Sequence, residues 1–453
     1  MDVSAIKPNI FVEAMSNIFA SNIEKLNNNS LKPDRKYFIE LFKNKGIPDT
    51  KNEEYKYTNL ITVLNNNYNY NLNPQKRNLK INDIFKCDVP ELNADILILL
   101  NGHYYSEKEI IKEKANGIII GSLSAAANKY PNIINKYLNQ NQNNTDSLVA
   151  LNKAFSTDGI FIYIPENITL TQPIQIINIA MADEDLMIQH RNMIIIDKNS
   201  KAEIIICDHT LSPKKFLTNQ VLEIFAAENS QLSVTRLQNE HLGAVQISHS
   251  FISQGKSSKV TFNNITLHGG LVRNNIFVSL DGENSENYTN GLYFLDKGQH
   301  VDNYVFVEHK KPYCTSNQLF KGILDDYSTG AFTGKILVYR DAQKTLAYQS
   351  NKNILLSDDT KIDSRPQLEI YADDVKCSHG SAVGQMDENA MFYLQSRGIS
   401  QKEARFMLLS GFSNEVIKQI EAEPLRLRVN DLIEKRLRGE LSRCNNCEIN
   451  CND

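Results

Sequence analysis

The sequence has no tryptophan, no surplus of either charge and no long apolar run. Its 453 residues include 49 Lys plus Arg and 53 Asp plus Glu, a formal net charge of −4. This balance lacks the positive charge on which non-specific nucleic-acid binding depends. Apolar runs such as 96–100 are far shorter than the roughly 18 residues that span a membrane. We therefore expect neither a nucleic-acid nor a membrane partner.

The cysteines do not form an even, regularly spaced set. The chain has seven, at positions 87, 207, 314, 377, 444, 447 and 451. An odd number scattered over a long chain argues against a disulfide framework and favours a reducing compartment. Residues 1–19 include Asp2 and Glu13 and lack the continuous apolar stretch of a secretory signal. We expect a cytoplasmic protein.

A nucleotide-binding loop is also missing. Gly255-Lys256-Ser257 has the end of a P-loop, but Ser250 stands where the first glycine is required. The segment 330–335 (GAFTGK) is one residue too short and lacks the following Ser or Thr. If the function involves ATP, we expect a different chain to bind it.

The middle of the chain has a repeat. From about 160 to 383, short β-rich segments alternate with polar turns, and Ser200, Ser230, Ser258 and Ser285 recur at steps of 30, 28 and 27 residues. A polar turn at nearly constant spacing predicts a parallel β-helix of about eight coils, in which neighbouring coils bury each other's inward side chains. An antiparallel sandwich with irregular turns is the alternative. We expect a β-helix over 156–385.

Helical patterns flank this repeat. We expect a mostly helical N-terminal domain over 1–155 and a C-terminal helical domain over 386–441, with Gly411 ending one of its helices. The last helix has an apolar stripe that includes Leu425 and Ile433, with arginines such as Arg436 on the opposite side. Such a helix either packs one face on its own domain or binds a protein partner.

Paired carboxylates suggest a glycoside hydrolase as one alternative. The pairs are Asp325-Asp326, Asp358-Asp359 and Asp373-Asp374. Hydrolysis needs two carboxyl groups facing one bond, whereas neighbours on a strand point to opposite faces. Without tryptophan to stack a sugar, we interpret these residues as turn aspartates.

Two places have metal-ligand chemistry. Cys377 and His379 lie two residues apart, and an extended segment would place a thiol and an imidazole on the same face. They could form half of a zinc or iron site, or be a buried cysteine beside a hydrogen-bonded histidine. The second place is Cys444-x2-Cys447-x3-Cys451, which lacks a fourth local ligand. We expect the tail 442–453 to be disordered, with metal binding as the alternative.

Several segments resemble the SufB/SufD family, whose members are scaffold subunits of the SUF iron–sulfur cluster assembly machine. The family signature consists of 373–385 (DDVKCSHGSAVGQ), whose Cys-Ser-His-Gly part is the most specific, and, further along the chain, 392–399 (FYLQSRGI). Further matches are 53–60 (EEYKYTNL, with Tyr55 where the family usually has Trp), 151–155 with Asp158-Gly159, Pro165 with Leu170 and Pro173-Ile174, Gly269-Gly270 with Arg273-Asn274, and Gly291-Leu292-Tyr293. The resemblance covers about residues 30–440. Within the family the chain is more similar to the SufD branch, because SufB-type chains have Cys-Glu-His at the position of Cys377-Ser378-His379.

The resemblance implies a right-handed parallel β-helix flanked by helical terminal domains, and a non-enzymatic scaffold. It implies pairing with SufB through the β-helix and binding of the SufC ATPase through the C-terminal helices. His379, with Cys377 as its neighbour, is the implied cluster-assembly residue, facing a cysteine of the partner. A nascent iron–sulfur cluster would be shared with SufB, with no stably bound cofactor. The alternative to a cluster-assembly role is a purely structural subunit, or a homodimer of the isolated chain, with no direct part at the cluster. The tail cysteines lie outside the family pattern.

Overall fold

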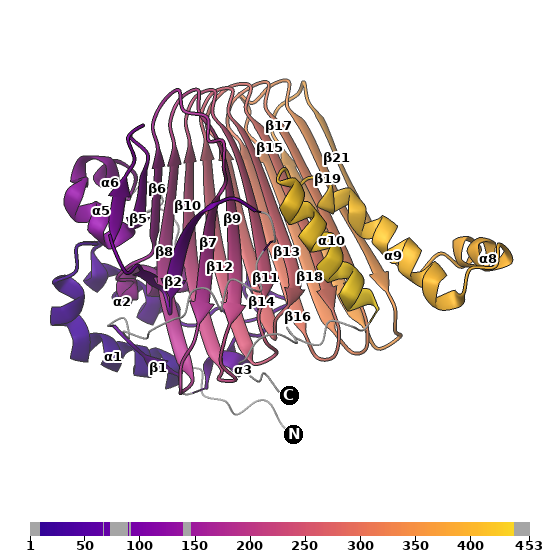
Figure 1. Cartoon of the computed structure of the whole chain (residues 1–453), viewed down its shortest axis with the longest axis horizontal. Coiled ribbons are helices and arrows are strands. Elements are labelled where there is room, and N and C mark those ends of the chain that lie inside the picture. Colours follow the sequence, from indigo (N-terminus) through magenta and orange to yellow (C-terminus); the bar gives the residue numbers. More distant parts are fainter. Residues whose placement is uncertain (1–9, 67, 73–88, 90–91, 139–145, 439–453) are drawn as a thin grey trace.

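The computed structural model describes residues 10–66, 68–72, 89, 92–138 and 146–438. The middle of the chain coils into a parallel β-helix with two long sheets (Figure 1). Successive strands alternate between the sheets, so each strand pairs with the strand one coil away. The predicted β-helix of about eight coils is confirmed, and the antiparallel sandwich is excluded.

We call the eleven-stranded sheet A and the ten-stranded one B. Sheet A contains, in spatial order, β20 (Lys361–Ile370), β18 (Thr329–Val338), β16 (His300–His309), β14 (Leu271–Leu280), β12 (Ala244–Gln254), β10 (Phe216–Ala226), β8 (Leu186–Ile196), β6 (Ile160–Ile164), β5 (Ile119–Ser122) and β4 (Ile111–Glu113), with β1 (Asn69–Tyr70) beside β8. Sheet B contains β21 (Lys376–Gly384), β19 (Leu346–Leu355), β17 (Thr315–Leu324), β15 (Glu286–Leu295), β13 (Lys259–His268), β11 (Gln231–Asn239), β9 (Lys201–Thr210), β7 (Ile174–Ala180), β2 (Asp95–Leu100) and β3 (His103–Tyr105).

The serine repeat marks one edge of the solenoid. Each of the four serines is at most 1% exposed and directly precedes a strand of sheet B. The residue before each has a left-handed backbone, with φ of 56° at Asn199, 57° at Asn229, 53° at Ser257 and 57° at Asn284. The series continues through Cys314 and Thr345, which follow Tyr313 and Lys344 at φ of 62° and 61°. The turn therefore requires a small buried side chain, which is not always serine.

The space between the sheets, here called the lumen, holds the main core. At one edge it is apolar, with Ile, Val, Leu and Phe side chains from successive coils. At the other it is lined by buried polar side chains, among them Gln220, Gln238, Gln246 and Asn274. Hydrogen bonds join these polar groups to one another, as burial away from water requires.

The N-terminal helices cover the outer face of sheet A. They are α1 (Ile10–Asn27), α2 (Arg35–Lys45), η2 (Glu53–Tyr55), α3 (Ile61–Leu64), α5 (Leu123–Lys129), α6 (Pro131–Tyr137) and α7 (Ser147–Phe155). Helices α1, α2 and α7 share a core with Met187, Leu217 and Val245 of sheet A. Strands β2 to β5 from the same part of the chain extend both sheets, so this region is not purely helical.

The C-terminal helices α8 (Glu388–Ser396), α9 (Gln401–Ile417) and α10 (Glu423–Leu437) follow the last strand. Helices α9 and α10 pack on the outer face of sheet B, through residues such as Val416 and Val429. Gly411 does not end a helix as expected, because α9 continues through it and packs on both sides of it. Arg436, expected on the solvated face, is instead about one-tenth exposed and pairs with Asp296.

No helix within the described ranges has both the length and the apolar character needed to cross a membrane.

Candidate functional site at the open end of the solenoid

Cys377 and His379 lie on β21, the last strand of sheet B. With β20 it forms the final coil, here called the terminal coil. The parallel register pairs Cys377 with Ala347 and His379 with Gln349. Ala347 and Gln349 are 0% and 3% exposed, whereas Tyr348 between them is 41% exposed on the outer face. Side chains alternate along a strand, so Cys377 and His379 both lie on the lumen side. This is the shared face expected from their spacing.

The two side chains differ in their surroundings. His379 is exposed, and its imidazole makes no hydrogen bond to another described residue. Cys377 is partly buried against a small apolar cluster that includes Ile336 and Ala347. Burial raises the pKa of the Cys377 thiol, although a backbone hydrogen bond at Ala347 opposes the shift. The thiol is therefore protonated near neutral pH and must lose its proton before it binds a metal.

A chain of hydrogen bonds runs from the buried lumen to this open end. Tyr293, 1% exposed, donates to Asn353 at 2.5 Å, and Asn353 donates to Asn351 at 2.8 Å. Ser364 on β20 also donates to Asn351 at 2.7 Å, and Ser381 on β21 donates to Ser364 at 2.8 Å. The floor of the terminal coil is thus polar and internally bonded. Sequence analysis missed it, because these residues come from four different strands.

The described residues hold no group of three or more His, Cys, Asp or Glu side chains arranged to bind a metal. Cys377 and His379 can supply two ligands, so the remaining ligands of any metal must come from elsewhere. Cys444, Cys447 and Cys451, with the rest of the tail 442–453, lie outside the described residues. Of the other cysteines in the described part of the chain, Cys207 and Cys314 are buried.

The carboxylate pairs do not form a hydrolytic site. Asp325-Asp326, Asp358-Asp359 and Asp373-Asp374 each lie in a turn between two strands rather than on a strand. Asp325 accepts a hydrogen bond from Arg405 of α9 at 3.0 Å. These are the turn aspartates expected from the sequence.

A second polar cluster lies in the lumen, several coils away from the open end, at β9, β11 and β12. Arg236 donates to Asp208 at 2.9 Å, and Gln246 donates to the same carboxylate oxygen at 2.9 Å. Both charged side chains are at most 3% exposed. Glu240 is buried nearby, and its Oε2 has no hydrogen-bond partner among the described residues. Burial, and then the charge of Asp208, raise the pKa of Glu240 to about 8.

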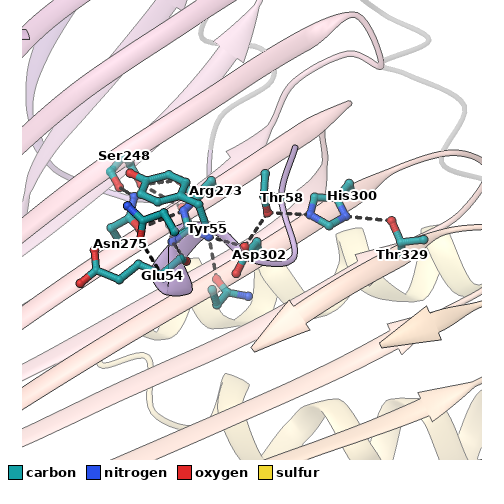
Figure 2. A network of polar contacts seen from close by, with 12 residues as sticks. Glu54, Tyr55, Thr58, Ser248, Arg273, Asn275, His300, Asp302 and Thr329 are labelled. Atoms are coloured by element: carbon teal, nitrogen blue, oxygen red, sulfur yellow. Dashed lines mark hydrogen bonds and ion pairs between the residues drawn. The ribbon is translucent and has the colours of Figure 1, made fainter. Parts of the chain in front are cut away.

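Residues 53–60, here called the strap, cross the outer face of sheet A (Figure 2). Arg273 of β14 is fully buried beneath the strap, donates to the Glu54 carbonyl at 2.6 Å and pairs with Asp302. Thr58 hydrogen-bonds to both Asp302 and His300. Two segments quoted separately for the family resemblance, the strap and Arg273, therefore form one network. Sequence analysis did not anticipate this contact.

The C-terminal helices expose an aromatic pair. No residue of α8 is buried, and the helix stands clear of the solenoid, at the end opposite α1 and α2 (Figure 1). Phe392 and Tyr393 on this helix are 72% and 57% exposed. Both belong to the segment 392–399 quoted above for the family resemblance.

Two family models match most of the chain. Residues 178–412 match the model of the SUF system FeS cluster assembly SufBD core domain, and residues 11–176 match that of the SufBD protein N-terminal region. The chain is 28% identical to an iron–sulfur cluster assembly SufBD family protein of Synechocystis, over 86% of this chain and 87% of the relative. It is 27% identical to the iron–sulfur cluster assembly protein SufD of Escherichia coli, over 90% and 93% of the two chains. Identity to SufD of Bacillus subtilis is 23%, over 72% and 75%.

Proposed function

Because the chain belongs to the SufBD family of iron–sulfur cluster assembly proteins, we propose that it is a non-catalytic, cytoplasmic scaffold subunit of the SufD type. The observation that carries this proposal is the position of His379 and Cys377 on the lumen face of the terminal coil. Two exposed or half-exposed donors at an open end suit a site completed by another chain.

The partner we propose is a SufB-type chain that binds the open end of the β-helix. Strand β21 pairs with β19 on one side, and on its other side no described strand pairs with it. Unpaired strand edges offer N–H and C=O groups for pairing with a second chain. A partner docked there would bring its own donors to His379. The proposal therefore accounts for both the incomplete ligand set and the exposed edge.

The nascent cluster is the cargo of this site, not a resident cofactor. A neutral imidazole can bind iron without losing a proton from the coordinating nitrogen, whereas the Cys377 thiol must first be deprotonated. Since burial raises the pKa of that thiol, His379 is the better first ligand. Cys377 would then act as a neighbour that joins only after a bound cation lowers its pKa.

ATP would act through a SufC-type subunit. The segment Gly255-Lys256-Ser257 lies in a turn between β12 and β13, not at the start of a helix. The exposed Phe392 and Tyr393 on α8 are the surface we assign to the ATPase. ATP-driven dimerisation of two such subunits would pull on the C-terminal helices, shear the scaffold interface and expose His379 to iron and sulfide.

The test is a complex reconstituted from this chain with SufB- and SufC-type subunits. His379→Ala should abolish cluster formation, measured by iron and sulfide content and visible absorbance, while size-exclusion chromatography shows an intact complex. Ser378→Ala, one residue away on the outer face of the same strand, is the matched control and should form clusters normally. Full cluster formation by His379→Ala would contradict the proposal and favour the purely structural subunit.

A further inference from the structure

Gln349 on β19 is the residue that pairs with His379 where β19 and β21 lie side by side. Its side chain is 3% exposed and lies on the lumen side, the side that His379 shares. Neighbouring strands of a sheet are about 4.8 Å apart, so side chains paired in this way are within reach of each other. Gln349 is therefore a buried polar residue in register with His379, on the same face of the sheet.

The amide of Gln349 is hydrogen-bonded on one side only. Its Nε2 donates to the Oε1 of Gln318, one coil deeper, at 2.7 Å. Gly334 of sheet A leaves the necessary room, since a Cβ there would lie 1.8 Å from Nε2. With its nitrogen directed at β17, the amide keeps its oxygen for another neighbour, and β21 is the strand on the other side of β19.

That oxygen has no partner. The Oε1 of Gln349 is buried and accepts no hydrogen bond from any described residue. The imidazole of His379 likewise makes no hydrogen bond within the described part of the chain. An unpaired buried acceptor costs free energy, so its presence in a fold calls for an explanation. Here the missing donor and the missing acceptor belong to residues paired on adjacent strands.

We propose that Gln349 is a positioning residue for His379: its Oε1 accepts the hydrogen bond of one imidazole N–H. This inference rests on the proposed function and deepens it. The bond fixes the tautomer, so that the other ring nitrogen keeps its lone pair for iron. A histidine ligand in a metal site usually has such a partner on its second nitrogen, which orients the ring and raises its basicity.

The test is imidazole ¹⁵N NMR on the full-length chain with labelled histidine, the His379 signals being identified by their absence in His379→Ala. The parent should show one dominant His379 tautomer and a ring N–H protected from solvent exchange. In Gln349→Met, which keeps the shape but removes the acceptor, the protection should be lost and the tautomer ratio should become that of free histidine.

Two further variants make the result specific. Gln349→Glu keeps an acceptor, and the Nε2 of Gln318, unpartnered in the structure, is available to donate to the new carboxylate. This variant should restore the protected N–H. Gln367→Met, the same substitution on the outer face of β20, should leave the His379 signals unchanged.

A parent spectrum identical to that of Gln349→Met would overturn the inference, as would failure of Gln349→Glu to restore protection. If Gln349→Met does not fold, the parent spectrum and Gln349→Glu decide the question. The NMR experiment measures the tautomer in the isolated chain, without iron or sulfide. Its result is therefore independent of whether the His379→Ala complex assembles clusters. A protected N–H together with normal assembly by His379→Ala would support the hydrogen bond and contradict the proposed function.

Discussion

The guanidinium of Arg273 lies over the ring of Tyr55, with 4.0 Å between the guanidinium carbon and the ring centroid. Both side chains are at most 1% exposed, and the same guanidinium pairs with Asp302 and donates to the backbone of the strap. One buried cation therefore fastens the strap to β14 and β16.

Replacing Arg273 with Ala should strongly destabilise the fold. It leaves the Asp302 carboxylate buried without its cation, and breaking a buried pair in this way costs about 3–5 kcal/mol. Urea unfolding followed by circular dichroism measures the loss. The control is Arg365→Ala, which removes the pair of Arg365 with Glu53, whose side chains are 35% and 70% exposed. That loss should stay below about 1 kcal/mol, and equal losses in the two variants would contradict the role assigned to Arg273.

The stability of the fold should fall as pH rises, in part because of Glu240. Burial raises its pKa from 4.5 to about 8 in the folded chain. The folded state thus holds a proton that the unfolded state has lost between these values, and its stability decreases across this range. Glu240→Gln removes the titration and should be more stable than the parent at pH 8 by at least ~1 kcal/mol. The difference should shrink towards pH 4.5.

The control for this pH series is Glu228→Gln, because the Glu228 side chain is 41% exposed. Its stability should follow that of the parent at every pH. A constant offset between Glu240→Gln and the parent from pH 4.5 to 8 would show that Glu240 does not titrate as inferred.

The left-handed turn at Asn229 should tolerate glycine but not valine. Its φ is 57°, where a β-branched side chain is strained, and this strain costs roughly 1–2 kcal/mol. Asn229→Val should lower the free energy of unfolding by about that amount. Asn229→Gly loses only the exposed hydrogen bond to Asn199 and should stay within about 0.5 kcal/mol of the parent. Equal stability of the two variants would rule out backbone strain as the reason for the repeat.

Phe392→Asp should weaken binding of a SufC-type ATPase at least tenfold, because it places a charge in the surface that we assign to this partner. Isothermal titration calorimetry measures the affinity, and the thermal unfolding temperature should not change since Phe392 is 72% exposed. Tyr37→Asp is the matched control, because Tyr37 on α2 is also exposed, at 55%, but lies at the other end of the molecule. Unchanged affinity in Phe392→Asp would exclude α8 from the interface.

Sequence reasoning found the features that depend on local spacing. The serine turns recur at nearly constant steps, and the extended conformation of β21 places Cys377 and His379 on one face. It did not find Cys314 and Thr345 as members of the same series, because the turn selects for a small buried side chain rather than for serine. The prediction that Gly411 ends a helix was wrong, because packing of α9 on sheet B outweighs the roughly 1 kcal/mol that glycine costs in a helix.

Contacts between distant segments could not be predicted from the sequence for a different reason. From β6 and β7 onward, the step between paired residues of neighbouring coils varies from 26 (Val245 to Leu271) to 32 (Thr329 to Lys361). A shift of one residue reverses the side of the sheet on which a side chain lies, so the partner of His379 could not be counted from the sequence. The contact of Tyr55 with Arg273 depends likewise on how the strap crosses sheet A.

The coils of the β-helix are not held equally along its length. The strap ties β14 to β16, and Arg436 with Asp296 and Arg405 with Asp325 join the C-terminal helices to the turns that follow β15 and β17. Toward β20, the strap contributes the exposed pair of Arg365 with Glu53. In a chain of stacked repeats each coil depends on its neighbours, so fraying starts where such cross-links are sparse. We therefore expect the strand that carries His379 to open locally at a lower free-energy cost than the coils between β14 and β17.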